Sequence, residues 1–239
     1  SAEDDAAGFE IAAQLEAKTG AQEQAARNIS DAKSMLSVAE GGLESQLNIV
    51  QSMKNKATQA ANDSLGDSER KAIQGELDEL TSELQDIAKN TSFNGTDLLN
   101  TSGSGNVSLN FQTGAAKTDT FKAEISPTEK TDLGDASGNT LGANVKVNGT
   151  DGERKTTIET IDGAIDDLTS ELSDIGATQN RLSFKKENLE TATRNLNSAQ
   201  SQIEDADFAR EQTEAAKLQV LQQTGTAQLA QANAAGQSV

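Results

Sequence analysis

Carboxylates are the side chains of this sequence that could do acid–base or metal chemistry, and they occur in clusters. The clusters are Asp4 with Asp5, Asp166 with Asp167, and Glu204, Asp205 and Asp207. A calcium loop needs oxygen ligands at alternating positions with a glycine at its centre, and none of the clusters has that spacing. Acidic residues also stabilise helix N-termini and cover solvated helix faces. We therefore interpret these clusters as surface charge, and we predict no catalytic residue and no metal site.

The residue types that most often carry catalysis are missing. The chain has no His and no Cys, which removes the usual general base, the commonest metal ligand and the thiolate nucleophile. The glycine-containing stretch 105–152 lacks the Lys-Ser/Thr pattern of a phosphate-binding loop. The sequence therefore predicts a protein that is not an enzyme and that needs no cofactor.

The net charge excludes two kinds of partner. With 38 acidic and 20 basic residues, the formal charge is −18, and such a chain repels phosphate backbones and anionic membrane surfaces. No apolar run approaches the about 20 residues needed to span a bilayer. We predict no nucleic acid and no membrane as partners. The acidic surface fits either a solubility role or adaptation to salty surroundings.

Two segments have the apolar spacing of long helices. The first seam contains apolar or small residues at alternating intervals of three and four, and it indicates a helix over residues 2–61: Ile11, Leu15, Ala25, Ile29, Ala32, Leu36, Ala39, Leu43, Leu47, Val50, Met53 and Ala57. A turn follows at 62–68, and a second helix contains Ile73, Leu77, Leu80, Leu84 and Ile87. Gly41 and Gly42 are expected to loosen the first helix.

Helical spacing stops at Asn90, and the chain to about Asp151 is rich in Gly, Thr, Ser, Asn and Asp. Residues 107–111 and 120–125 alternate apolar with polar side chains, which predicts a β-hairpin, and residues 143–147 form a weaker strand candidate. The last long seam predicts a helix that should pair with the N-terminal helices: Ile158, Ile161, Ile165, Leu168, Leu172, Ile175, Gln179, Leu182, Lys186, Leu189, Thr193, Leu196 and Ile203. Beyond residue 206 the composition becomes rich in Ala, Gln and Thr, so this tail is expected to fray.

Five sequence blocks, in order, resemble one family. They are EDDAAG at 3–8, QAAN at 59–62, NTSFNG at 90–95, SQIEDADFARE at 201–211 and LQQTGTAQLAQAN at 221–233. Together they resemble bacterial flagellin, at both ends of the chain but not in its middle. The resemblance implies a structural subunit of the flagellar filament, which self-assembles for motility, and an extracellular location after secretion through the flagellar export apparatus.

The fold implied is mainly α: an elongated antiparallel bundle of long coiled-coil-like helices, with a small β-hairpin region in the middle of the chain. The expected parts are N-terminal rod helices at 1–100 and a variable hairpin and loop region at 101–155. A C-terminal rod helix at 156–205 precedes a core-layer segment at 206–239, which should be flexible without its N-terminal partner. Because the family has a further N-terminal helix, the chain is expected to be N-terminally truncated and monomeric in dilute solution.

The resemblance also implies partners: other flagellin subunits, the flagellar export chaperone and Toll-like receptor 5. The chaperone segment maps to the tail, with Leu218, Leu221 and Leu229 as its apolar positions. Receptor recognition in the family uses an Arg and a Leu on the first long helix and a Glu on the second. Ser52 and Lys56 stand at the Arg and Leu positions and Glu83 at the Glu position, so two of three depart and receptor binding is expected to be weak.

Two other functions compete with the filament subunit. A hook-filament junction or adaptor protein shares the N-terminal block but generally lacks the ending at 221–233, which favours flagellin. A flagellin homologue used as a cell-surface binding protein would carry an inserted domain. The middle region of about 55 residues is too short for an independent catalytic domain without disulfides or metal.

Overall fold

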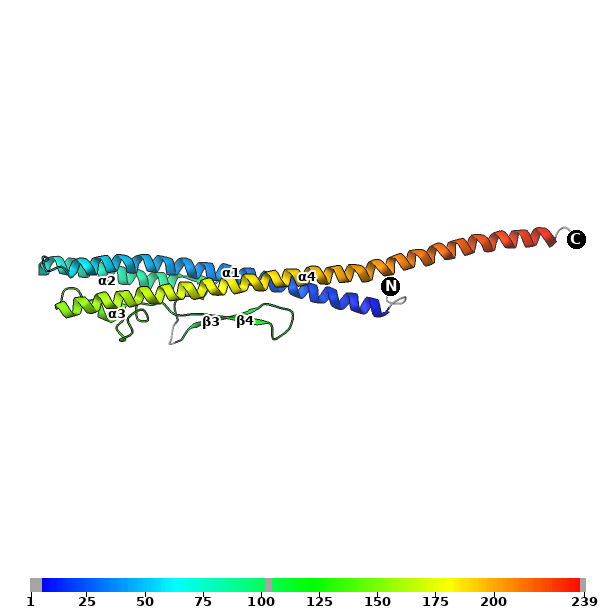
Figure 1. Cartoon of the computed structure of the whole chain (residues 1–239). Helices are drawn as coiled ribbons and strands as arrows, with labels where there is room; N and C mark the ends of the chain where they lie inside the picture. The colour runs from blue at the N-terminus through cyan, green and yellow to red at the C-terminus, as the bar shows by residue number, and fades with distance from the viewer. Residues whose placement is uncertain (1–5, 102–104, 237–239) are drawn as a thin grey trace. The chain divides into compact units, whose positions relative to one another are not determined.

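The computed structural model describes residues 6–101 and 105–236. The described chain consists mainly of two long helices, α1 (Ala6–Ala60) and α4 (Asp151–Gly236), joined by the shorter α2 (Asp67–Asn90) and a region with small antiparallel sheets (Figure 1). It divides into two compact units. One comprises residues 25–187 and the other the two chain ends, 1–24 and 188–239. The fold is mainly α with a β-hairpin, as the sequence predicts.

In the unit 25–187, α1 supplies the central seam of the core. Most of the predicted seam is buried: Ala25, Ile29, Ala32, Leu36, Ala39, Leu43, Val50, Met53 and Ala57. Between Leu43 and Val50 the buried residue is Gln46, while Leu47 is only half-buried, so the prediction of Leu47 on the seam is wrong. The helix is continuous across Gly41 and Gly42, and the loosening expected there stays a prediction.

Helix α2 packs antiparallel to α1. It buries Ile73, Leu77 and Leu84, and Lys56 of α1 forms an ion pair with Glu76 of α2. The turn between the two helices is fixed by Arg70, whose guanidinium donates to the carbonyl oxygens of Ala60 (3.2 Å) and Asn62 (3.1 Å). The first bond satisfies the carbonyl of the last residue of α1, which has no partner within the helix, and the second holds the turn that follows.

The region after α2 contains two antiparallel hairpins. Strands β1 (Ser92–Phe93) and β2 (Thr96–Asp97) are joined by Asn94 and Gly95, both with positive φ (49° and 79°), as a tight two-residue hairpin turn requires. Strands β3 (Val107–Gln112) and β4 (Thr120–Ile125) pair in register from Val107 with Ile125 to Gln112 with Thr120. The predicted hairpin is therefore confirmed, and β4 buries Phe121, Ala123 and Ile125.

The weaker strand candidate at 143–147 is wrong. The structure has a short helix, α3 (Leu141–Asn144), followed by irregular chain. The backbone groups of residues 145–147 are satisfied by side chains of α2 and α4 instead of a neighbouring strand. Gln74 donates to the carbonyl of Val145 (2.9 Å) and accepts from the amide of Val147 (2.7 Å), which leaves no need for strand pairing there.

Helix α4 begins at Asp151, earlier than the spacing of its apolar residues suggests. Thr150 and Glu153 form a reciprocal cap: the Thr150 amide donates to the Glu153 carboxylate (2.7 Å) and the Glu153 amide donates to the Thr150 hydroxyl (3.3 Å). The helix runs antiparallel to α1, because Lys54 pairs with Asp162 whereas Lys33 contacts Ser183.

The buried side of α4 differs in part from the predicted seam. Ile161, Leu168, Ile175 and Leu182 are buried as expected. The other buried positions of α4 within the unit 25–187 are Arg154, Thr157, Thr160, Ala164 and Glu171. Ile158, Ile165 and Leu172 are only half-buried, so their assignment to the centre of the seam is wrong.

In the unit formed by the chain ends, residues 6–24 of α1 and the last part of α4 make few buried contacts. Ala12, Thr19 and Gln22 are buried, whereas Ile11 of the predicted seam is exposed. Thr193 donates to the Gln22 side chain (3.2 Å). Helix α4 continues to Gly236 where fraying was expected, and every residue from 212 to 230 is exposed. The acidic block at residues 3–5 lies outside the described residues.

Candidate functional site

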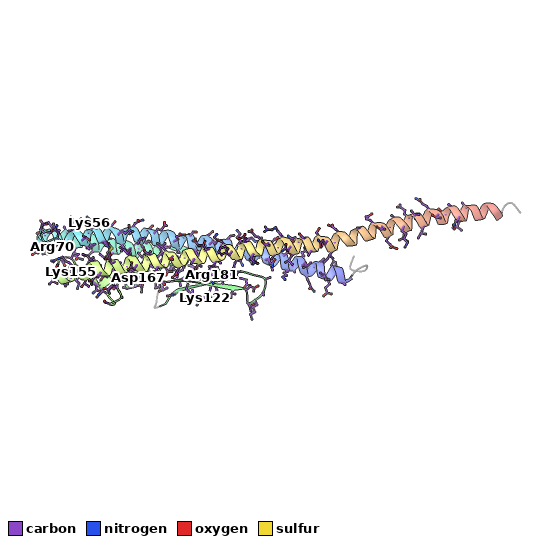
Figure 2. The ribbon with its side chains drawn as sticks, in the orientation of Figure 1. Lys56, Arg70, Lys122, Lys155, Asp167 and Arg181 are labelled. Atoms are coloured by element: carbon purple, nitrogen blue, oxygen red, sulfur yellow. The ribbon has the colours of Figure 1, made fainter. Side chains whose placement is uncertain are left out.

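The first two positions that the resemblance assigns to the receptor lie one turn apart on α1. Ser52 is exposed, and its hydroxyl donates to the carbonyl of Asn48 (3.1 Å) on its own helix. The Lys56 ammonium is paired with the Glu76 carboxylate of α2. Figure 2 labels Lys56 at the end of the bundle near the α1–α2 turn, close to Arg70. If the predicted alignment holds, a hydroxyl and a paired ammonium stand where the family pattern has a guanidinium and an apolar side chain.

The third position lies on the neighbouring helix at a similar level. Glu83 is exposed on α2. The stretch that contains it is aligned with α1 by two contacts, the Lys56–Glu76 pair and a hydrogen bond from Gln46 to the carbonyl of Leu84 (3.1 Å). The structure thus places Ser52, Lys56 and Glu83 on the same stretch of the unit 25–187. A receptor contact at these positions stays a prediction.

The positions assigned to the chaperone form a separate apolar stripe. Leu218, Leu221 and Leu229 are 58%, 57% and 66% exposed on α4. At 100° per residue, these three side chains fall within an arc of about 80° on the helix. Exposed leucines that share one face of a helix are typical of a surface that binds a partner. The identity of that partner stays a prediction.

A hollow lined by acidic residues lies between α4 and the segment after β4. It has a volume of about 340 Å³, and its lining includes Asp132, Asp167, Glu171 and Asp174. Burial raises the pKa of Glu171, an effect that hydrogen bonds from Ser126 partly offset. Burial and the nearby Glu129 carboxylate raise the pKa of Asp132. Among the described residues, no group of three or more potential ligands is arranged to hold a metal ion.

The described helices also include none that combines the length and apolar character needed to cross a bilayer. The hollow is lined by carboxylates, and the chain has no histidine or cysteine that could work with them in acid–base or nucleophilic chemistry. One carboxylate oxygen of Glu171 is buried there without a hydrogen-bond partner.

Three glutamines hold the middle region on the helices, and the sequence reasoning missed them. Gln46 is fully buried; its amide donates to the carbonyl oxygens of Leu84 (3.1 Å) and Thr128 (3.0 Å), and its oxygen accepts from the Thr128 hydroxyl (2.8 Å). Gln74 binds the chain at 145–147 as described above. Gln85 accepts from the amide of Lys130 (3.2 Å). The only sequence signal was Gln46 itself, a polar residue three positions after Leu43 within an apolar seam.

The ends of the chain match two family models. Residues 1–104 match the bacterial flagellin N-terminal helical region, and residues 158–239 match the bacterial flagellin C-terminal helical region. Flagellin FlaB1 of Treponema pallidum is 32% identical over 99% of this chain and 84% of the relative. The chain belongs to the bacterial flagellin family. This flagellin is a structural subunit of the flagellar filament, as the five sequence blocks implied.

Solved structures agree with the assignment. The crystal structure of Bacillus cereus flagellin is 25% identical, covers 68% of this chain and 88% of its own, and has a TM-score of 0.53. A putative flagellar hook-associated protein from Vibrio parahaemolyticus has a TM-score of 0.70 at 18% identity, with 84% of this chain and 100% of its own covered. At that identity the second likeness shows the shared fold alone, so it does not favour the junction protein over the filament subunit.

Proposed function

We propose that this flagellin is exported, assembles with copies of itself outside the cell and has no catalytic activity. One observation carries the proposal most directly. The unit 25–187 buries most of its apolar seam residues within itself, whereas residues 212–230 are all exposed and include three leucines on one face. A helix with an unpaired apolar face gains stability when it packs against other helices. Assembly would supply that packing.

The proposed layout follows the same division. Residues 1–100 and 156–205 supply the paired helices of the subunit, 101–155 form the variable region, and 206–239 form the C-terminal segment that packs on neighbouring subunits. Salt-induced assembly of the intact protein, viewed by electron microscopy, tests this. Filaments are expected from the parent and from Val38→Ser, and no filaments from Leu218→Ser with Leu221→Ser and Leu229→Ser. Normal filaments from the triple variant would contradict the assigned role of the tail.

Before assembly, we propose that the export chaperone covers the same three leucines. Each fully buried leucine contributes about 1.5–3 kcal/mol, so losing two should weaken binding by at least about a hundredfold. Calorimetric titration of the protein with its own export chaperone measures this for Leu218→Ser with Leu221→Ser. Val220→Ser is the matched control, because Val220 is equally exposed (62%) but lies on another face. If the parent, the double leucine variant and Val220→Ser bind the chaperone with equal affinity, the chaperone does not bind at these leucines.

Toll-like receptor 5 is proposed as a weak partner. Ser52 offers no bidentate donor, and Lys56 brings a charge that is already paired with Glu76. Replacing Ser52→Arg and Lys56→Leu restores both anchors beside Glu83, and because an anchor contributes about 2 kcal/mol or more, signalling should strengthen by roughly a thousandfold. A receptor-reporter cell line measures the change.

The matched control for that experiment is Ser45→Arg. Ser45 is exposed on the same helix and makes the same kind of hydrogen bond, from its hydroxyl to the carbonyl of Gly41 (2.9 Å). It should leave signalling unchanged. Strong signalling by the parent, or equal gains from both variants, would show that Ser52 and Lys56 are not the receptor-facing positions.

A further inference from the structure

The most exposed large apolar side chain among the described residues is Phe184, at 72%. It lies on α4 within the unit 25–187, between Arg181 and Lys185. At 100° per residue, these three side chains fall within an arc of about 100° on the helix surface. We call Arg181, Phe184 and Lys185 the basic–aromatic patch. Aromatic and arginine side chains in such a cluster are the types that dominate interface energetics.

The two cations of the patch are held in place by a buried ring. The Arg181 guanidinium lies 4.8 Å and the Lys185 ammonium 5.9 Å from the centre of the Phe121 ring on β4, and Phe121 is only 4% exposed. Figure 2 shows Arg181 beside the hairpin that carries Lys122. Cation–π contacts of this kind orient the charge without neutralising it. The patch is therefore preorganised, which reduces the entropy lost on binding.

No described carboxylate lies within ion-pairing distance of Arg181 or Lys185. Two further lysines nearby are bound to hydroxyl groups instead of acids: Lys33 to Ser183 (2.8 Å) and Lys186 to Ser30 (2.9 Å). In a chain with a formal charge of −18, this is a local concentration of positive charge without acidic partners. Its electrostatic complement is an acidic surface.

The same unit presents such a surface on another helix. Glu79, Glu83 and Asp86 are exposed on α2 at intervals of four and three, so they lie on one face. No described Lys or Arg forms an ion pair with them. We call these three residues the acidic stripe.

We propose that the basic–aromatic patch of one subunit docks on the acidic stripe of a second copy of this chain. The inference rests on the filament role proposed above and names the surfaces that carry part of the subunit contact. Arg181 and Lys185 would pair with the carboxylates of the stripe, while Phe184 would be removed from water between the helices.

The two surfaces lie at different levels of the unit, and this decides the kind of assembly. The patch is level with Ser30 and Lys33 of α1, whereas the stripe is level with Gln46, which contacts Leu84. The offset of 13 to 16 residues corresponds to about 20–25 Å along the helix. Contact between two different surfaces is heterologous, so each added copy leaves a patch and a stripe free for the next.

Because the chain has no Cys, single cysteines can report the contact. Asn180→Cys lies beside Phe184 and Ser82→Cys beside Glu83, and both leave the patch and the stripe intact. The two variants, with different tags, are mixed in concentrated solution and in salt-assembled samples and then mildly oxidised. Asn55 is exposed on α1 outside the stripe, so Asn55→Cys is the control partner for Asn180→Cys. Disulfides between Asn180→Cys and Ser82→Cys should exceed those between Asn180→Cys and Asn55→Cys by at least about tenfold, which corresponds to about 1.4 kcal/mol of binding free energy.

Charge reversal tests the pairing itself. Adding Arg181→Glu to the Asn180→Cys copy should reduce the disulfide yield about tenfold, and adding Glu83→Lys to the other copy should restore most of it. Phe184→Ser should reduce the yield similarly, whereas Val38→Ser, at an exposed apolar residue on α1 that is not part of the patch, should not. Equal yields with Asn55→Cys, no rescue by the double reversal, or no disulfide under either condition would each overturn the proposal. Electron microscopy of the same samples scores filaments separately, so filaments without this disulfide reject the contact and leave the filament role intact.

Discussion

At the scale of single residues, Glu171 carries an energetic cost that its neighbours do not fully offset. The side chain is 93% buried (7% exposed), and one carboxylate oxygen has no hydrogen-bond partner. Burial disfavours the ionised form, and Asp174 adds a like charge. The pKa of Glu171 is therefore raised in the folded state, although hydrogen bonds from Ser126 oppose the rise.

The sign of the resulting pH dependence follows from this raised pKa. The unfolded chain loses the Glu171 proton near the ordinary value of 4.5, while the folded chain keeps it to a higher pH. Between those two values the folded state binds more protons, so the free energy of unfolding falls as the pH rises. The full cost is present above the folded-state pKa and absent below the unfolded-state value.

Glu171→Gln removes the charge and keeps the shape. We expect the variant to be more stable than the parent by about 1–3 kcal/mol at neutral pH, with the difference shrinking as the pH falls through the raised folded-state pKa and absent once the pH is below 4.5. Urea unfolding at several pH values measures it. Asp166→Asn, at an exposed position of the same helix, is the control for removing a carboxylate charge. A constant difference at all pH values would contradict the ionisation argument.

At the scale of elements, the contact between α4 and the loop at 134–135 depends on a glycine inside the helix. A Cβ atom at Gly163 would collide with the backbone oxygen of Gly134 and lie 2.7 Å from the Cα atom of Asp135. The same loop is held by Asp167, which accepts from the amide of Gly134 (3.2 Å). The loop backbone therefore approaches the helix more closely than any side chain allows.

Gly163→Ala and Gly176→Ala form a matched pair on one helix. Nothing lies within 4 Å of a Cβ atom at Gly176, so alanine there should stabilise the protein by about 0.5–1 kcal/mol through helix propensity. Alanine at Gly163 should destabilise it by about 1–3 kcal/mol, because backbone must move. Thermal unfolding followed by circular dichroism compares them. A gain in stability from both substitutions would show that the loop does not pack against α4 at Gly163.

At the scale of the whole molecule, the two compact units differ in how much of their surface is buried. In the unit 25–187, α1 has fully buried side chains such as Leu36 and Leu43, whereas residues 212–230 of α4 bury none. Helices without tertiary packing open at low free energy, so their amides exchange quickly.

Hydrogen exchange followed by mass spectrometry should therefore separate the two regions. Peptides from residues 212–230 should exchange at least about a hundredfold faster than peptides from 29–57, since about 3 kcal/mol of local stability corresponds to that factor. In assembled filaments, amide exchange of residues 212–230 should also become slow, because neighbouring subunits would cover Leu218, Leu221 and Leu229. Slow exchange of this tail in the free protein would mean that a partner surface within the chain protects it.

The sequence by itself determined the helices, the hairpin and the family. Apolar spacing predicts helices because burial of a continuous stripe needs a period near 3.6 residues. The alternation at 107–111 and 120–125 predicts strands because successive side chains of a strand point to opposite faces. The five family blocks lie in local segments that need no tertiary information to read. Both sets of predictions concern neighbours along the chain.

Only the tertiary structure decided which side of a seam is central and which polar residues are buried. Gln46 replaces Leu47 in the core because the chain at 128 crosses α1 there and requires donors and an acceptor. Residues 145–147 are not a strand because Gln74 satisfies their backbone. The patch around Phe184 emerges from the position of the β3–β4 hairpin, whose Phe121 ring holds Arg181 and Lys185. Each of these depends on residues far apart in sequence meeting in space, and the spacing of residues along one helix does not specify such contacts.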